Sequence, residues 1–206
     1  MTSLKLDKNY KKITNFFLED DGEYEGLEIS SNNPGDVSFD SLEFKDCYIK
    51  NCDFSQLKIS NLSLVDVKFE NCNLANLDIE ELYAKRVVFE KCRMTGFIAN
   101  ESVLSELVFK NCQLKFSQFR FSRLKNIKFD NCFLGESDFY SAEMSKVNFL
   151  KCDLSKSEMS KSSHFQTDLR TSDISGLNIS TESLKGITVS RSQINDLIWL
   201  LEFNIE

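Results

Sequence analysis

Large apolar side chains recur at every fifth residue over about 150 residues of this chain. The series runs from Phe39 to Ile194, and only Ala84, Ala99 and His164 interrupt it. A period of five fits neither the 3.6 residues of a helical turn nor the two-residue alternation of a strand. The chain must therefore be analysed as a repeat, and the repeat decides the fold class.

A second column of smaller residues stands two positions before the large ones. Two inward side chains separated by one outward side chain match strand alternation, so the other two residues of each unit must turn the chain. Similar residues also recur every 20 residues, which indicates that four units complete one turn of a four-sided coil. The clearest columns are predicted core ladders: Phe69, Phe89, Phe109, Phe129 and Phe149, and Cys52, Cys72, Cys92, Cys112, Cys132 and Cys152.

The motifs within the units resemble those of the pentapeptide-repeat family, whose loose consensus is A-D/N-L-x-x. Close matches are Cys72-Asn73-Leu74, Cys152-Asp153-Leu154 and Thr167-Asp168-Leu169. This resemblance implies an all-β solenoid, a right-handed quadrilateral β-helix in which the large residue is central on each side. Several stacked turns are needed for stability, because no single turn buries its own apolar face.

The register divides the chain into three parts. Residues 37–189 carry the uninterrupted repeat and form the predicted β-helix. Residues 1–36 are expected to form an N-terminal cap and an irregular first turn, and residues 190–206 a C-terminal capping helix and dimerisation tail. Both caps are expected because a stacked coil otherwise presents unpaired strands at its ends.

The C-terminal tail begins with Ser190-Arg191-Ser192-Gln193, a capping-box pattern that predicts the start of a short α-helix. Apolar residues follow at helical spacing and also off that face, more than is needed to seal the coil, so we expect a homodimer. A monomer with a half-exposed Trp199 is the alternative. The tail also resembles that of Qnr- and MfpA-like pentapeptide-repeat proteins, which implies that the helix makes the dimer. The predicted dimer residues are Ile194, Leu197, Ile198, Trp199, Leu201 and Phe203, and Phe203 is also expected to lie in a terminal strand.

All seven cysteines occupy the small inward position of the repeat, which predicts reduced core thiols rather than disulfides. His164 is the only histidine and no C-x-x-C motif occurs, so we expect no metal site and no cofactor. The sequence has no run of 18 apolar residues and no N-terminal signal pattern, which predicts a cytoplasmic protein without a membrane segment.

No catalytic motif is present, and we expect a non-enzymatic protein. Glycine-rich phosphate loops are absent from the sequence. A Ser–His–Asp arrangement would need His164, which occupies a large inward slot of the repeat. His164 is expected to be a tolerated core residue, or to be replaced inside by Phe165 through a local bulge.

The formal net charge of −7 is uneven, with 14 acids and 8 bases in residues 1–70 but 9 acids and 10 bases in residues 71–140. Net acidity argues against direct binding of nucleic acid. The resemblance to Qnr- and MfpA-like proteins implies a DNA mimic that binds DNA gyrase or topoisomerase IV and protects it from quinolones. A protein-interaction scaffold with an unrelated partner is the alternative.

The candidate partner-binding acids lie close to the expected dimer contact. They are Glu143, Asp153, Glu158, Asp168 and Asp173. Mimicry of DNA requires such acids to align on one side of the coil, and a spread over all four sides argues against their use as one surface.

Overall fold

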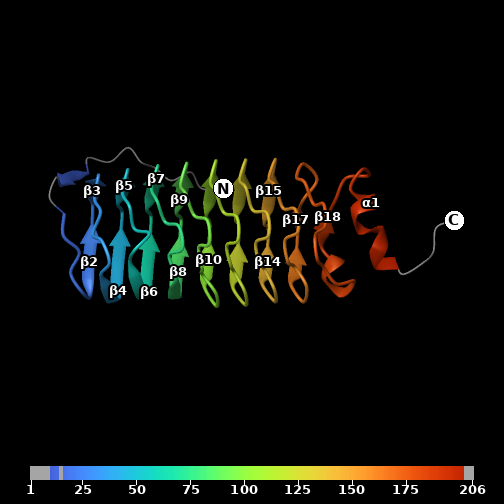
Figure 1. Ribbon diagram of the computed structural model, residues 1–206, viewed down its shortest axis with the longest axis horizontal. Coiled ribbons are helices and arrows are strands. Elements are labelled where there is room, and N and C mark those ends of the chain that lie inside the picture. The colour runs from blue at the N-terminus through green and yellow to red at the C-terminus, as the bar shows by residue number, and fades with distance from the viewer. Residues whose placement is uncertain (1–9, 14–15, 202–206) are drawn as a thin grey trace.

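The protein is a rod-shaped parallel β-solenoid in the computed structural model, which describes residues 10–13 and 16–201 (Figure 1). Two parallel sheets run along the rod, one of ten strands and one of eight. The ten-stranded sheet contains β1 (Lys11–Ile13), β3 (Leu27–Ser30), β5 (Tyr48–Lys50), β7 (Lys68–Glu70), β9 (Val88–Glu90), β11 (Val108–Lys110), β13 (Lys128–Asp130), β15 (Asn148–Leu150), β17 (Thr167–Asp168) and β18 (Ile187–Thr188). The eight-stranded sheet contains β2 (Gly22–Glu25), β4 (Ser38–Lys45), β6 (Lys58–Val65), β8 (Ile79–Lys85), β10 (Val103–Ser105), β12 (Arg123–Lys125), β14 (Glu143–Ser145) and β16 (Ser163–Phe165).

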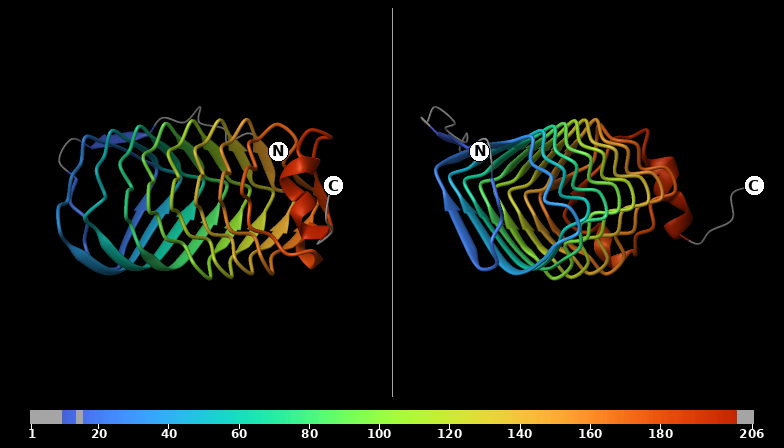
Figure 2. Two further views of the ribbon diagram at one scale, coloured as in Figure 1. Left: turned by 45° about the vertical axis from the view of Figure 1, so that its right-hand side comes forward. Right: turned by 60° about the vertical axis from the view of Figure 1, so that its left-hand side comes forward.

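Each turn of the coil contains 20 residues, as the sequence predicts. Phe109 pairs with Phe129 in one sheet, and Leu104 pairs with Leu124 in the other. The remaining two sides are ladders of single bridges in the same register, such as Gln118 with Asp138. Four sides per turn are therefore confirmed, and Figure 2 shows the turns nested along the rod axis.

The predicted phenylalanine ladder lies in the core. Neighbouring rings from Phe69 to Phe149 stack with centroids 4.8–5.1 Å apart and ring planes within 10° of parallel. All five rings are buried. The rung spacing of a parallel sheet therefore places each ring in contact with the ring of the next turn.

The cysteine ladder is also buried, and all seven thiols are free. The Cys112 Sγ donates to the carbonyl oxygens of Phe89 and Lys110, at 3.3 and 3.5 Å. Ser122 occupies the same position on another side and donates to the Ala99 carbonyl oxygen at 2.8 Å. The small inward column therefore favours cysteine and serine because both can donate a hydrogen bond to a carbonyl of the preceding turn.

Most corners of the coil place one residue in the left-handed region, two positions after the large inward residue. Asn fills many of these positions, but Phe116 and Phe121 also adopt φ values of 62° and 58°. Left-handed φ costs an ordinary L-residue about 1 kcal/mol or more. The corner that precedes the eight-stranded sheet is absent from three turns, because β4, β6 and β8 run through it as strands of seven or eight residues.

The first turn begins within residues 1–36, the segment predicted to form an N-terminal cap and an irregular first turn. The 20-residue register starts with the pairing of Gly22 and Leu42, and it ends with that of Asp168 and Thr188. Before it, β1 pairs with β3 in a different register, with Lys11 opposite Leu27.

The C-terminal end is sealed by a short helical segment, consisting of α1 (Ile194–Leu197) and the 3-10 helix η2 (Ile198–Leu201). Another 3-10 helix, η1 (Glu182–Leu184), precedes β18. Gln193 is buried, and its Nε2 donates to the carbonyl oxygens of Leu169 and Ser172 at 2.8 and 2.7 Å. The Ser172 carbonyl belongs to the last complete turn and has no further turn to cover it, whereas the Leu169 carbonyl also accepts the backbone N–H of Ser172 at 3.0 Å.

The predicted capping box forms only in part. The Gln193 Oε1 accepts the backbone N–H of Ser190 at 2.8 Å, as in a capping box. The Ser190 hydroxyl instead pairs with the hydroxyl of Ser192, and no side chain caps α1. The reciprocal bond to the Ser190 hydroxyl is lost because the Gln193 backbone N–H donates instead to the Ser190 carbonyl oxygen at 3.2 Å.

His164 stays in the large inward slot, and the alternative with Phe165 inside is wrong. β16 keeps the regular register, with His164 opposite Met144 and Phe165 opposite Ser145. Phe165 is 57% exposed. No bulge is needed because the imidazole finds hydrogen-bond partners inside the coil.

Candidate binding surfaces

His164, the single histidine of the chain, forms a part-buried hydroxyl–imidazole pair with Ser162. Ser162 Oγ lies 2.8 Å from His164 Nε2, and Thr167 Oγ1 lies 3.3 Å from His164 Nδ1. Burial lowers the pKa of His164 to about 4, so the ring is neutral near pH 7. In a catalytic triad a carboxylate binds the histidine Nδ1, but here the Thr167 hydroxyl occupies that position. Ser162, which stands at the position of the nucleophile, is buried. We assign this pair a packing role.

Among the described residues, no group of three or more His, Cys, Asp or Glu side chains is arranged to hold a metal ion. Within residues 10–13 and 16–201, no helix has the length and apolarity required to cross a membrane. Burial raises the pKa of the Cys47 thiol, which keeps this residue in its unreactive protonated form.

The five predicted partner-binding acids lie on all four sides of the coil. Glu143 belongs to β14 of the eight-stranded sheet and Asp168 to β17 of the ten-stranded sheet. Asp153 and Asp173 are bridge partners on the third side, and Glu158 lies in the bridge ladder of the fourth. Only Asp153 and Asp173 are brought together, so the five acids do not form one surface.

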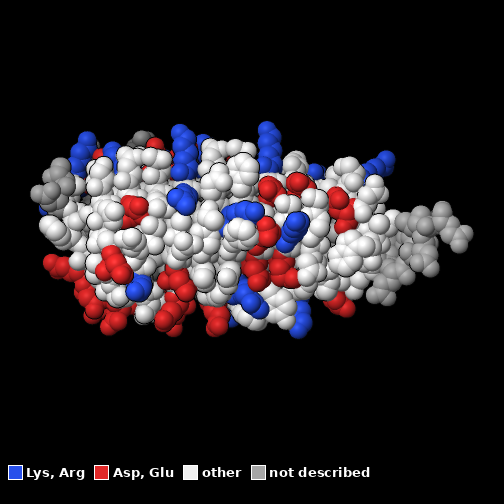
Figure 3. Space-filling view, viewed as in Figure 1, with Lys and Arg blue, Asp and Glu red and all other residues white. Residues whose placement is uncertain are grey.

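A different set of acids does align. When turns of 20 residues are counted from Asp20, the first two residues of each turn form one edge of the rod, beside the eight-stranded sheet. We call its acidic part the acidic edge, and it consists of Asp20, Asp21, Asp40, Glu80, Glu81 and Glu101. All six side chains are exposed, and none forms an ion pair with a described Lys or Arg. Figure 3 shows acidic side chains gathered along the lower border of the first half of the rod.

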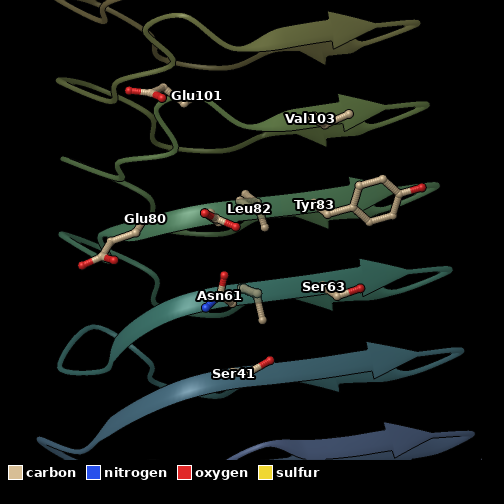
Figure 4. Close-up of a pocket in the computed structure, with 10 residues that line it drawn as sticks. Ser41, Asn61, Ser63, Glu80, Leu82, Tyr83, Glu101 and Val103 are labelled. Atoms are coloured by element: carbon tan, nitrogen blue, oxygen red, sulfur yellow. The ribbon is translucent and has the colours of Figure 1, made fainter.

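A shallow groove of about 490 Å³ adjoins the acidic edge (Figure 4). Its lining includes Glu80, Glu81 and Glu101 together with the exposed Tyr83 and Val103. The groove lies where β6 and β8 continue as straight strands at the position of the missing corner. Later turns of the coil have a projecting corner at this edge, and the groove occupies the space that such a corner would fill.

The same edge carries cations and aromatic rings in the second half of the rod. The Arg120 guanidinium lies 5.8 Å from the ring centre of Phe121 and 5.2 Å from that of Tyr140. The Lys161 Nζ lies 5.3 Å from the Tyr140 ring. We call Arg120, Phe121, Tyr140 and Lys161 the aromatic–cation cluster. Phe121 is 52% exposed, so the cluster is available for contact.

The C-terminal end presents a small apolar surface. Ile194 and Trp199 are each 52% exposed, and Ile198 is half-buried. Leu197 instead packs against the core of the coil, together with Leu200. The side chain of Leu201 and all of Phe203, including its expected terminal strand, lie outside the described residues.

Sequence reasoning missed the acidic edge although a signal for it exists. The six acids are adjacent only when the sequence is written in rows of 20, which places Asp20, Asp40 and Glu80 in one column. Distance from the C-terminus along the chain, which the five candidate acids share, does not show the side on which each residue lies.

The fold and these surfaces define a class of protein: a solenoid that presents ladders of outward side chains along straight edges. The chain belongs to the pentapeptide-repeat family, and the pentapeptide repeat region of that family matches residues 62–139 and 84–159. No curated protein sequence matches the chain.

Several solved structures are similar. HetL, a pentapeptide-repeat protein involved in heterocyst differentiation regulation from Nostoc sp. strain PCC 7120, is 13% identical, with 80% of this chain and 88% of HetL covered and a TM-score of 0.42. Full-length QnrB1, a plasmid-mediated fluoroquinolone resistance protein, is 17% identical over 88% of this chain and 100% of QnrB1, with a TM-score of 0.35. Rfr23 from Cyanothece 51142 is 13% identical over 82% of this chain and 88% of Rfr23, with a TM-score of 0.28.

Proposed function

We propose that this protein is a non-enzymatic binding rod whose acidic edge contacts a basic surface of a protein partner. The observation that carries the proposal is the alignment of six exposed carboxylates, free of ion pairs with described bases, on one edge. From the turn of Asp20 to the turn of Glu101 the edge spans roughly 19 Å at the usual strand spacing. Averaged over these five turns, of which that of Ser60 and Asn61 carries no acid, the density is about one carboxylate per 3 Å, near that of one phosphate per 3.4 Å along one DNA strand.

For the partner we propose DNA gyrase or topoisomerase IV, with protection from quinolones as the consequence. The charge spacing of the acidic edge supports this choice, as does the resemblance of the C-terminal tail to that of Qnr- and MfpA-like proteins. The proposal requires a cytoplasmic protein, and seven reduced buried thiols suit that compartment. We further propose a homodimer through the exposed Ile194 and Trp199 at the C-terminal end, with no direct contact to nucleic acid.

The test is a gyrase supercoiling assay with a quinolone, with and without the purified protein. We expect the protein to restore supercoiling, and we expect the variant Glu81→Lys with Glu101→Lys to lose that effect. Glu106→Lys with Glu136→Lys is the matched control, because it makes the same charge change at corners on other edges of the rod.

Equal rescue by both variants would exclude the acidic edge as the contact. No rescue by the unaltered protein at any concentration would reject both topoisomerases as partners and leave the alternative, an interaction scaffold for an unrelated protein. Recovery of a basic protein that binds the unaltered rod but not the Glu81/Glu101 variant would then identify the partner.

A further inference from the structure

The edge that carries the acids changes character at the middle of the rod. From residue 20 to residue 101 its two residues per turn include six acids and no Lys or Arg. From residue 120 to residue 181 they include Arg120 and Lys161 and no acid, with Phe121 and Tyr140 between them. One straight edge therefore carries an anionic half and a cationic, aromatic half.

The two halves also differ in shape. In the first half, β4, β6 and β8 run straight across the edge, and the groove of about 490 Å³ lies beside it. In the second half, the edge projects as turns with left-handed residues at Phe121, Ser141 and Lys161, and in the acidic half only Asp21 and Glu101 share this corner. A recessed acidic surface and a projecting cationic ridge thus lie end to end on the same line.

We propose that two copies of this chain pair side by side in antiparallel orientation through this edge. A two-fold axis between the turn of Glu101 and the turn of Arg120 makes the contact isologous. It places the Arg120–Phe121 corner of one copy against Glu101 and Val103 of the second copy. The turn of Tyr140 then faces the turn of Glu80 and Glu81, and Lys161 faces the polar floor of the groove at Asn61.

The regular spacing of the turns extends the match along the rod. Both copies have the same rise per turn, so once one turn is opposite its counterpart, the others from residue 40 to residue 181 also align. The overlap is about 34 Å long at the usual strand spacing. A strip roughly 15 Å wide would bury about 1,000 Å² in total, near the lower limit for specific interfaces, so we expect a weak association in the micromolar range.

The contact depends mainly on charge: the partly exposed Arg120, which also pairs with Asp138 of its own chain at 3.6 Å, faces the exposed Glu101, and Lys161 adds a second exposed cation. Exposed charge pairs are screened over about 10 Å at 0.1 M salt. The association is therefore expected to weaken with increasing salt, unlike an apolar contact through Ile194 and Trp199. If the proposed function also holds, pairing covers the acidic edge, and a basic partner must displace the second copy before it binds.

The experiment is sedimentation velocity on the full chain carrying Ile194→Ser and Trp199→Ser, which removes the separate apolar end contact. In this background we expect a concentration-dependent dimer whose dissociation constant rises at least tenfold between 50 and 300 mM salt. Glu81→Lys with Glu101→Lys gives the overlapping part of the edge, residues 40–181, four bases against the two acids Asp40 and Glu80, and Arg120→Glu with Lys161→Glu leaves only acids among the charged residues of the edge. Each of these variants alone should remain monomeric, and an equimolar mixture of the two should form a heterodimer.

Glu106→Lys with Glu136→Lys is the control, since it carries the same charge change on other edges. It should self-associate like the background chain. Circular dichroism shows whether each variant keeps its fold, and the altered side chains are all at least partly exposed. A background chain that is monomeric at 300 µM and 50 mM salt would overturn the proposal. Self-association that the edge variants leave unchanged would also overturn the proposal. The same holds if the control forms heterodimers with the anionic variant as well as the cationic variant does. Gyrase rescue does not enter this readout, so failure of the two proposals can be distinguished.

Discussion

Removal of one ring from the middle of the phenylalanine ladder should have a large and local cost. Phe109 is 1% exposed and stacks between Phe89 and Phe129 at centroid distances of 4.9 and 4.8 Å. Phe→Ala substitutions in a core cost about 3–5 kcal/mol. Each lost aromatic pair adds about 0.5–1.5 kcal/mol. We therefore expect Phe109→Ala to reduce the free energy of unfolding by about 5 kcal/mol.

The cost should remain because the site cannot close. Phe89 and Phe129 belong to backbones held by the sheet register, so their rings stay about 10 Å apart and leave a gap the size of one ring. Apolar cavities of this kind bind benzene, so added benzene should recover part of the loss.

Thermal unfolding followed by circular dichroism measures the effect, and the melting temperature should fall by about 10 °C or more. Phe133→Ala is the control, because this ring belongs to the following turn, points outward and is 49% exposed. Surface changes of this kind stay within about 0.5 kcal/mol. Equal melting temperatures for the two variants would refute the assignment of stability to the ladder.

Three further predictions concern polar side chains inside the coil. The pKa of His164 is lowered to about 4 by burial, so as pH falls from about 6.5 to 4 the unfolded chain takes up a proton that the folded chain does not. Stability should drop by up to about 3 kcal/mol over that window, and His164→Leu should remove this part of the pH dependence of urea unfolding. Cys112→Ser should keep the hydrogen bond to the preceding turn and lower the free energy of unfolding by less than about 1 kcal/mol. Cys112→Leu should lower it by about 1–3 kcal/mol through overpacking, and chemical denaturation measures both changes. Gln193→Leu should leave the Ser172 carbonyl without its side-chain donor and the Leu169 carbonyl with only the backbone N–H of Ser172, and it should speed amide hydrogen exchange in the last turn while the middle of the rod is unchanged.

The core of the fold was predictable because its constraints are periodic. The spacing of five determines which side chains point inward, and the spacing of 20 brings Phe109 beside Phe129. The corner conformations were not predictable residue by residue, since Phe116 and Lys151 adopt the same left-handed φ as Asn111. At these corners the surrounding ladder imposes a conformation that local preference opposes.

The ends and the surface were harder to predict for a different reason. The role of Gln193 depends on which carbonyls remain uncovered after the last turn, and the helical pattern contains no information about them. The sequence predicted an acidic binding surface but placed it at Glu143 and Asp168, which lie in different sheets. The alignment of acids along one edge depends on where each residue lies around the coil, and distance along the chain does not determine that position.

The 20-residue register also determines how such a rod can change length. A duplication of 20 residues adds one turn, lengthens the rod by about 4.8 Å, and returns every downstream side chain to its former column. A duplication of five residues adds a single side and rotates everything downstream by a quarter turn about the rod axis. Inserted between Glu101 and Arg120, it would move the aromatic–cation cluster to a neighbouring edge while both halves keep their cores. Insertions of five residues can therefore place the two halves of the rod in any of four relative orientations about its axis. Each insertion changes which distant surfaces share an edge and leaves the surfaces themselves unaltered.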